Sequence, residues 1–402
     1  MSTLKVDAIR HNSATSDAIT TAADGTCTAK LTSINGGSQL SHRNIIINGA
    51  MTVAQRASST TSNGYGFVDR FQTNVASLST GGNVTRSQQS LSSSDTGPWQ
   101  AGFRKYARMA TVGAGTASAG STIDFYTHIE AQDMANSGWD YTSASGKITL
   151  SFWFRCSANQ TFYTYVRSRD GTQQGYTFAF TASGNNTWTK ITHTLPGNSN
   201  ITFDDNNGAG LSIYWIPYYG TTYTNNKTLN TWAEHSGSNT SPDMQSTWLT
   251  SGAATWDITG IQLEVGDTAT TFEHKSEQEE LLRCYRYYYK MGELDYKGAH
   301  MSAGETYGIG MSDNDNTNVY CQIDFPVPMR EPPSTLDQAG ASNYYVRRDT
   351  TQTCTGNPSL TNGSEFSFRV NFPKSNHGWG TGQMLWCQSA GSSSYLGFDA
   401  EL

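Results

Sequence analysis

The sequence predicts an almost entirely β-structured protein, in which a large and a smaller β domain are joined by one short helix. Apolar and polar residues alternate along many short segments, which is the pattern of half-buried strands. Turn-forming pairs such as Asn-Asn, Asp-Gly and Gly-Asn separate these segments. A single stretch combines helical spacing of apolar residues with a helix-capping signal. We therefore expect an all-β fold with an N-terminal arm and two β-sandwiches.

The predicted strands are densest in residues 44–275, which we expect to form one jelly-roll-like β-sandwich. Ile148, Leu150, Phe152 and Phe154 alternate with polar or exposed neighbours. An aromatic strand and a strand with the letters WTKI follow, in an order that resembles carbohydrate-binding jelly rolls. Antiparallel domains of this size commonly close as two-sheet jelly rolls. The alternation does not determine the order of the strands.

Residues 256–290 predict a strand that closes this sandwich and a helix that leaves it. The apolar positions change face at Gly260, which indicates a β-bulge. Ser276 and Glu279 form a capping box, and acidic residues fill the first turn of the helix. We expect the helix over residues 276–292, where a glycine can end it. A helix this short needs a surface to pack on, so it should connect two β domains.

The two ends of the chain differ in composition. Residues 1–43 are rich in Ser, Thr and Ala and contain few large apolar side chains. They predict an extended anchoring arm or, as the alternative, a disordered tail. Residues 293–402 contain about five further strands and predict a smaller C-terminal β domain. The sequence has no repeat of solenoid length and no heptad pattern, so we expect no fibrous shaft.

Composition and charge argue against several classes of function. The net charge is −7 and basic residues do not cluster, which argues against binding to nucleic acid. No apolar run is long enough for a membrane span, and the N-terminus lacks the layout of a signal peptide. The six cysteines are scattered without CxxC pairs, so we expect buried free thiols and no zinc site. No cofactor is expected.

Residues 214–252 are unusually dense in aromatic rings and small polar side chains. Sugar recognition commonly combines ring stacking with hydrogen bonds to polar side chains, because aromatic rings provide a large contact area at low entropic cost. The alternative is that these rings pack a long loop or an interface between copies of the chain. The candidate carbohydrate-binding residues are Tyr218, Tyr219, Tyr223, Trp232 and Trp248.

The sequence contains no recognisable catalytic motif, so we expect no enzyme activity and no catalytic residues. His128 nevertheless lies close to Asp124, Glu130 and Asp133, a group that would suit a glycan-cleaving site. Clusters of this kind on one strand are more commonly solvated faces or cross-strand pairs.

Two stretches carry clustered oxygen donors of the kind that calcium prefers, residues 203–210 and residues 312–318. Neither matches the EF-hand pattern, because the distal glutamate is missing. Such clusters are more often turns than ligands. We therefore expect no metal site.

Several segments of the chain share the sequence pattern of a known protein family. They are residues 1–9 (MSTLKVDAI), 44–57 (NIIINGAMTVAQRA), 65–71 (YGFVDRF), 261–290, 325–335 (FPVPMREPPST) and 395–402 (YLGFDAEL). Together they resemble a domain of tailed-phage virion proteins, especially the tail fibres of marine cyanophages. The matches bracket nearly the whole chain, but they do not indicate which position in the virion the protein occupies.

Arg56, Asp69 and Arg70 belong to this family pattern. We expect a structural role for them, in which a buried Arg–Asp pair ties the first strand of the domain to its neighbour.

The resemblance implies a non-enzymatic protein of the virion, made in the bacterial cytoplasm. It would be a tail fibre or short appendage that attaches to a glycan on the host surface. Its arm would bind other virion proteins, and the chain would form a homotrimer. The missing shaft leaves a second possibility, a head-decoration, knob or tail-collar protein with an architectural role. A surface-glycan depolymerase is the third.

Overall fold

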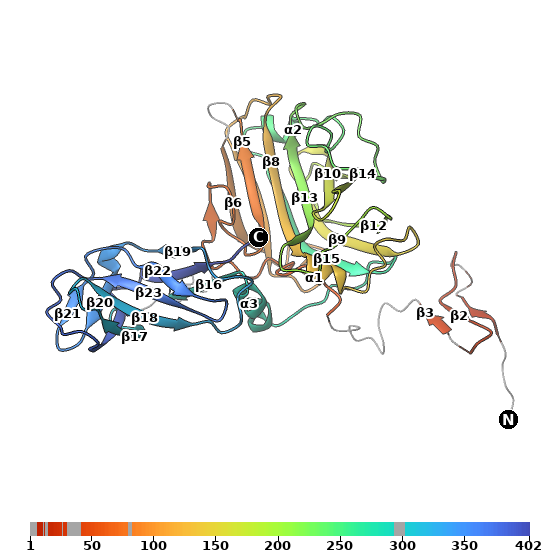
Figure 1. Ribbon diagram of the computed structural model, residues 1–402. Coiled ribbons are helices and arrows are strands. Elements are labelled where there is room, and N and C mark those ends of the chain that lie inside the picture. Colours follow the sequence, from red (N-terminus) through yellow and green to blue (C-terminus); the bar gives the residue numbers. More distant parts are fainter. Residues whose placement is uncertain are drawn as a thin grey trace.

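The computed structural model of the protein shows two β domains with a helix between them (Figure 1). It describes residues 6–10, 12, 15–25, 27–29, 42–78, 83–292 and 302–402. Nearly all of their regular structure is β-strand, which confirms the predicted fold class. The paired strands in both domains run antiparallel, as expected for sheets built from short turns.

The large domain consists of two six-stranded sheets that pack face to face as a jelly-roll-like sandwich. Its strands are β4 (Ser59–Thr60), β5 (Gln72–Ala76), β6 (Asn83–Ser90), β7 (Lys105–Val112), β8 (Thr122–Glu130), β9 (Lys147–Cys156), β10 (Asn159–Ser168), β11 (Gln174–Ser183), β12 (Thr189–Pro196), β13 (Ala209–Tyr219), β14 (Trp232–Glu234) and β15 (Thr255–Val265). The first sheet has the order β14-β11-β10-β13-β8-β5, and the second has the order β12-β9-β15-β7-β6-β4. The strand predicted to close the sandwich, β15, lies in the middle of the second sheet.

Aromatic rings fill the space between the two sheets. The side chains of Trp215 and Trp256 are completely buried. Phe154 packs edge-on against Trp256 with ring centroids 5.2 Å apart, and Phe152 packs in the same way against Trp215 at 5.9 Å. Burial of such rings contributes roughly 25 cal/mol for each Å² of apolar surface removed from water. The alternation predicted for β9 is therefore confirmed, with its aromatic face inside.

The predicted bulge at Gly260 is also present. The pairing register between β15 and β9 shifts between Thr259 and Gln262. Gly260 has a φ angle of +63°, and a Cβ atom at this position would lie 2.6 Å from the ring of Phe103. Both observations require glycine at the bulge.

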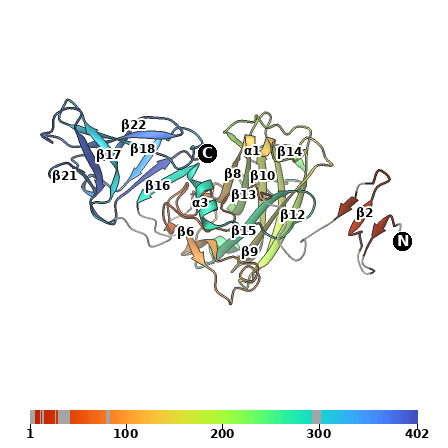
Figure 2. The ribbon, with the colours of Figure 1, turned by 90° about the horizontal axis from the view of Figure 1, so that it is seen from below.

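The connecting helix, α3 (Glu277–Tyr285), begins where predicted but ends earlier. The side-chain oxygen of Ser276 accepts a hydrogen bond from a backbone N–H of the first turn, at 3.2 Å. After the helix the chain becomes extended, and Tyr288–Gly292 forms strand β16, which pairs with β25 (Tyr395–Asp399). This pairing gives the backbone groups of residues 288–292 partners that a continued helix would otherwise supply. Figure 2 shows α3 between the two domains.

The C-terminal domain is a smaller sandwich of a three-stranded and a seven-stranded sheet. Besides β16 and β25 its strands are β17 (Thr306–Ser312), β18 (Asn318–Asp324), β19 (Thr335–Gln338), β20 (Tyr344–Arg347), β21 (Thr351–Thr353), β22 (Ser359–Gly363), β23 (Ser367–Pro373) and β24 (Met384–Ser389). The orders are β16-β25-β19 and β21-β20-β24-β17-β18-β23-β22. The sequence predicted about half of these strands, because several are too short to show a clear alternation.

The described part of the predicted arm forms a small antiparallel sheet and is not simply extended. Its strands are β1 (Ala8–Ile9), β2 (Ile19–Thr21) and β3 (Cys27–Ala29). The side chains of β1 and most of those of β2 are exposed, so this sheet has little core of its own. In Figure 1 it lies apart from both β domains.

Three further helical turns are present in the described chain, α1 (Ala131–Ala135), α2 (Thr247–Thr250) and the 3₁₀ turn η2 (Ala341–Asn343). Helices of about one turn leave no periodic signal in a sequence, so they were not predicted. None of the described helices combines the length and the apolar character that a membrane crossing needs. All six cysteines are free thiols and five are buried, as predicted.

A buried cluster of charges joins the two β domains. The carboxylate of Glu401 pairs with Arg70, and it lies 3.3 Å from Arg56. Arg56 also pairs with Asp399 at 2.9 Å. The side chains of Arg56, Arg70 and Glu401 are only 11%, 2% and 5% exposed. The guanidinium of Arg70 lies 3.3 Å from the centre of the Tyr287 ring, in a cation–π contact. These contacts hold the end of β25 against the first strands of the large domain.

The partners of Asp69 differ from those predicted. Asp69 is buried, but its carboxylate accepts hydrogen bonds from the backbone N–H of Gln55, at 2.8 Å, and from the Gln55 side chain. Burial raises the pKa of Asp69 to about 6, against the opposing charge of Arg56. The carboxylates that pair directly with Arg56 and Arg70 come from residues 399–401, more than three hundred residues later in the chain.

We expect Glu401→Gln to destabilise this junction strongly. The variant removes the negative charge that two buried guanidinium groups share, and breaking a buried ion pair costs about 3–5 kcal/mol. Glu331→Gln is the matched control, because Glu331 pairs with Arg330 and is 45% exposed, where a pair contributes about 0–1 kcal/mol. Urea unfolding of the full chain measures both changes. Equal effects of the two variants would contradict the role given to Glu401.

Candidate functional site

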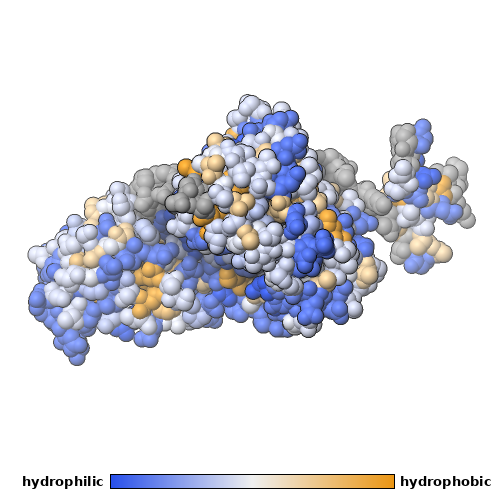
Figure 3. All heavy atoms as spheres, turned by 90° about the horizontal axis from the view of Figure 1, so that it is seen from above, coloured by the Kyte–Doolittle hydropathy of each residue, from blue (hydrophilic) through white to orange (hydrophobic). Residues whose placement is uncertain are grey.

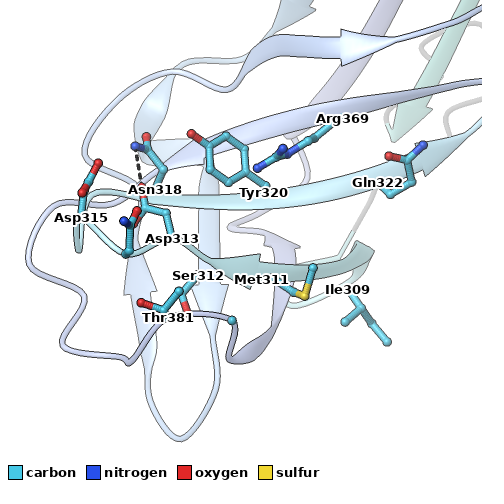
Figure 4. Close-up of a pocket in the computed structure, with 12 residues that line it drawn as sticks. Ile309, Met311, Ser312, Asp313, Asp315, Asn318, Tyr320, Gln322, Arg369 and Thr381 are labelled. Carbon is cyan, nitrogen blue, oxygen red and sulfur yellow. Dashed lines mark hydrogen bonds between the residues drawn. The ribbon is translucent and has the colours of Figure 1, made fainter.

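The C-terminal domain carries a groove of about 650 Å³ on the outer face of its seven-stranded sheet (Figure 4). Side chains of β17 and β18 and one residue of β23, Arg369, line it. The turn that follows β17, with Asp313 and Asp315, closes one end. The inner face of the same sheet is packed in the core of the domain, so the groove lies on the solvent side.

Ile309 and Met311 on β17 form one side of the groove, and exposed apolar side chains on the neighbouring strand β24 extend this side beyond it. Ile309 pairs with Trp386, and Met311 pairs with Met384, so the four side chains lie together on one face. Their exposed fractions are 56%, 47%, 57% and 65% in that order. We call these four residues the apolar strip. The face of the molecule seen in Figure 3 is mostly hydrophilic, with small separate apolar patches.

Two glycines explain why this apolar strip faces outward. Gly308 and Gly310 alternate with Ile309 and Met311 along β17 and point toward the core. A Cβ atom on Gly308 would lie 2.6 Å from the Cys321 sulfur, and one on Gly310 would lie 2.8 Å from a backbone oxygen of the next strand. The interior therefore has no room for a side chain at either of these two positions. The sequence could not reveal this, because alternation of Gly with apolar residues predicts the opposite face inside.

Polar side chains form the other side of the groove. The guanidinium of Arg369 lies 3.8 Å from the centre of the Tyr320 ring, as Figure 4 shows. Asn318 donates a hydrogen bond of 2.9 Å to Asp313. Burial acts to raise the pKa of Asp313. Hydrogen bonds from Asn318 and Thr317 outweigh this effect and hold the pKa below its ordinary value. Asp313 is therefore an ionised acceptor at neutral pH.

This arrangement suits a ligand with one apolar face and several hydroxyl groups. Exposed apolar clusters bordered by polar residues mark surfaces that contact other molecules. The indole of Trp386 on β24 offers a flat apolar contact, and Gln322, Arg369 and Asp313 offer donors and acceptors on the other side of Ile309 and Met311. A sugar ring has both kinds of surface, which makes it one class of ligand that would fit.

The residues predicted to bind carbohydrate lie elsewhere and are mostly packed inside the large domain. Trp248 is completely buried in the core, so its ring has no free face for a ligand. Trp232 is 8% exposed, and its indole N–H donates a hydrogen bond of 2.7 Å to the backbone oxygen of Pro196. Tyr218 is 7% exposed and also belongs to the core. The dense aromatic segment is therefore used for packing at these three positions, which was the alternative reading of residues 214–252.

Tyr219 and Tyr223 are half-buried and pack against each other, with ring centroids 5.7 Å apart. The hydroxyl of Tyr219 donates a hydrogen bond of 2.9 Å to Asp124. Neither ring contributes to the groove of the C-terminal domain. The five candidate residues therefore do not form one site. Three of them belong to the core, whereas Tyr219 at the end of β13 and Tyr223 in the following loop are half-buried.

The carboxylates grouped near His128 each have a structural partner or stand apart. Glu130 accepts hydrogen bonds from Arg286 at 2.7 Å and from Tyr287. Asp124, also on β8, is buried beneath Tyr219. Burial raises the pKa of Asp124 to about 7. Asp133 lies beyond the strand, in α1. Because Arg286 and Tyr287 hold Glu130, and Tyr219 holds Asp124, these carboxylates are not arranged as a ready acid–base pair.

The two stretches with clustered oxygen donors serve as turns. Asp205 accepts a hydrogen bond of 2.7 Å from Asn136, and Asp313 accepts those of its own turn. Within the described residues, no three His, Cys, Asp or Glu side chains come close enough to hold a metal ion.

No protein-family model and no curated protein matches the chain. Among solved structures, the enzymatically active domain of tailspike protein 4 of bacteriophage CBA120 matches with 8% identity and a TM-score of 0.28, over 56% of this chain and 21% of that one. A family 11 carbohydrate-binding module of Clostridium thermocellum, in complex with a mixed-linked tetrasaccharide, matches with 11% identity and a TM-score of 0.24, over 54% of this chain and 98% of that one. The N-terminal cellulose-binding domain of Cellulomonas fimi β-1,4-glucanase C matches with 11% identity and a TM-score of 0.24, over 41% and 80%. These likenesses concern the β-sandwich fold alone.

Asp124→Asn tests the assignment of Asp124 as a buried structural group. Because burial raises its pKa to about 7 in the folded chain, the folded state holds a proton that the unfolded state loses above about pH 4. Stability should therefore fall as pH rises from about 4 to 7, and the asparagine variant should lack this loss. The melting temperature of the variant minus that of the wild type should therefore increase as the pH rises from about 4 to about 8. A difference that does not change with pH would contradict the assignment.

Proposed function

We propose that this protein is a non-enzymatic attachment protein that binds a glycan through the groove of its C-terminal domain. The observation that carries the proposal is the apolar strip, whose exposed Trp386 lies next to a polar groove of about 650 Å³. Leaving four large apolar side chains in water is unfavourable unless a partner covers them. A sugar ring stacked on the strip would cover part of this surface, and its hydroxyls would face the groove.

The assignment to a phage particle rests on the sequence resemblance to tail fibres of tailed phages. In this proposal residues 1–43 bind other virion proteins, and the two β domains project from the particle as a homotrimer. None of the residues that line the groove belongs to the charged junction with the large domain, which agrees with a ligand that approaches from outside. Light scattering on the purified chain would measure the number of subunits.

The proposal of a non-enzymatic role is supported by the state of the acidic side chains. Glu130 is held by Arg286 and Tyr287, and Asp124 is buried beneath Tyr219. If purified protein released reducing ends from a host polysaccharide, the depolymerase alternative would replace this proposal.

An architectural role is the second candidate, since the apolar strip would also suit contact with a neighbouring protein of the particle. Virions with and without this chain distinguish the two candidates. Loss of heat stability with normal adsorption favours an architectural role. Normal heat stability with lost adsorption favours attachment.

Trp386→Ala should weaken glycan binding by about ten-fold or more, because it removes the largest apolar contact of the strip. Phe366→Ala is the control, since Phe366 is 59% exposed in the same domain but, unlike Trp386, is not paired with a residue that lines the groove. Binding of the full chain to an array of bacterial surface polysaccharides measures the effect. Thermal unfolding checks that both variants stay folded.

The result that contradicts the proposal is equal binding by Trp386→Ala and the wild type to every polysaccharide that the wild type recognises. In that case the groove of the C-terminal domain is not the glycan site. Retention of binding by Trp386→Ala together with loss of subunit or virion assembly would favour the architectural role.

A further inference from the structure

A row of tyrosines crosses the outer face of the first sheet in the large domain. Tyr165 on β10, Tyr214 on β13 and Tyr126 on β8 are direct cross-strand neighbours, and Gln72 on β5 continues the row. The rings of Tyr126 and Tyr214 stack with centroids 4.8 Å apart. These rings cover each other's faces, and the hydroxyl of Tyr126 donates a hydrogen bond of 2.7 Å to Gln72, which leaves its oxygen as an acceptor. The row is therefore suited to hydrogen bonding more than to stacking.

A basic row lies beside the tyrosine row. Arg167 on β10 is the cross-strand neighbour of Ser212, which in turn neighbours His128 on β8. Arg169 follows on the same face as Arg167, and its backbone N–H bonds to the oxygen of Gly210 at 2.8 Å. Gly210 has no side chain that could cover the guanidinium of Arg169. Both arginines are half-buried and keep contact with solvent.

Neither arginine has an acidic partner among the described residues. Arg167 donates to the neutral amide of Gln173 at 2.7 Å, and Arg169 takes part in no salt bridge with a described residue. The acids on the same side of the sheet are otherwise engaged or buried. Glu130 is held by Arg286 and Tyr287, and Asp170 accepts from a backbone N–H at 3.1 Å. Burial and Asp204 raise the pKa of the Asp170 carboxyl, and the charge of Arg169 acts to lower it, but neither arginine forms a salt bridge with a described acid on this face.

The pKa values of two histidines on this face are lowered in part by the charge of these arginines. Burial, together with Arg169, Arg70 and Arg167, lowers the pKa of His128 to about 3. Burial and the two arginines at 167 and 169, with a smaller effect of Lys227, lower the pKa of His235 to about 4. Both imidazoles are neutral at neutral pH. His128 bonds to Ser212 at 2.6 Å, and His235 bonds to the hydroxyl of Tyr165 at 2.6 Å.

We propose that this surface, the basic tyrosine face, binds the acidic group of a saccharide. It consists of Tyr126, His128, Arg167, Arg169, Tyr214 and the Tyr165–His235 pair. Arg169 and Arg167 donate to the oxygens of a carboxylate or sulfate, since guanidinium groups match such anions with paired hydrogen bonds. The hydroxyls of Tyr126 and Tyr214 bond to the hydroxyls of the sugar. The choice of a saccharide rests on the proposed function; the choice of an anion rests on the uncompensated arginines.

Arg169→Gln in the full chain tests the inference. The probes are tetragalacturonate, its fully methyl-esterified form and a sulfated carrageenan tetrasaccharide, measured by calorimetry at low and high salt. The wild type should bind the acidic probes at least about ten-fold more tightly than the ester, and salt should weaken that binding. Arg169→Gln should remove the preference for the acidic probes. Arg169→Lys should keep part of it, because it retains the charge but not the paired donors.

Arg104→Gln is the matched control, because Arg104 is exposed in the same domain but belongs to the loop before β7, on the second sheet. It should bind all probes as the wild type does. Thermal unfolding should show that Arg169→Gln stays folded, since its guanidinium forms no salt bridge with a described residue. Three results would overturn the inference: no acidic probe binds better than the ester, Arg169→Gln binds like the wild type, or inorganic sulfate competes as strongly as the whole saccharide.

The same binding measurements distinguish a failure of this inference from a failure of the proposed function. If Trp386→Ala loses glycan binding while Arg169→Gln retains it, the groove stands and the basic tyrosine face fails. If Arg169→Gln alone loses binding, the glycan site lies on the large domain and the groove fails.

Discussion

Glu401 places a negative charge in the interior of the molecule, where it is stable only because Arg56 and Arg70 are held beside it. Arg56 and Arg70 lie just before β4 and β5, the first strands of the large domain, and Glu401 follows the last strand of the small one. Pairing them therefore requires the chain to return to its starting point after more than three hundred residues. The tyrosines that follow α3 complete the arrangement, since the ring of Tyr287 lies against Arg70 and the ring of Tyr288 lies 3.5 Å from Arg56. The two β domains are joined through this cluster.

Apart from residues 1–9, the segments that resemble phage tail-fibre proteins meet at this same junction. Residues 44–57 and 65–71 supply Arg56 and Arg70, and residues 395–402 supply their carboxylate partners. Arg330, from residues 325–335, donates to the backbone oxygens of Ala400 and Glu401 at 2.7 Å. The resemblance therefore concerns the way in which two domains are fastened together. It says little about the groove and the basic tyrosine face, which lie on other strands.

Those surfaces differ in their chemistry because the two sandwiches expose different faces. On β17, glycines occupy the inward positions, so apolar side chains are left outside and form the apolar strip. On β8, β10 and β13, apolar residues occupy the inward positions, so tyrosines and arginines are left outside. The first surface suits contact with the face of a sugar ring, and the second suits hydrogen bonds and charge. A protein that recognises a long acidic polysaccharide would have use for both.

The sequence by itself determined the β class, the buried face of β9, the bulge at Gly260 and the capped start of α3. Each of these depends on residues within a few positions of one another, where alternation, glycine conformation and capping act locally. The tertiary structure decided the rest. It placed Trp248 in the core, brought Glu401 to Arg70 and turned Ile309 outward, because burial and ion pairing depend on segments that are distant in the chain. A sequence of aromatic residues shows that rings must be accommodated, but only the packing of the two sheets decides which of them remain free to meet a ligand.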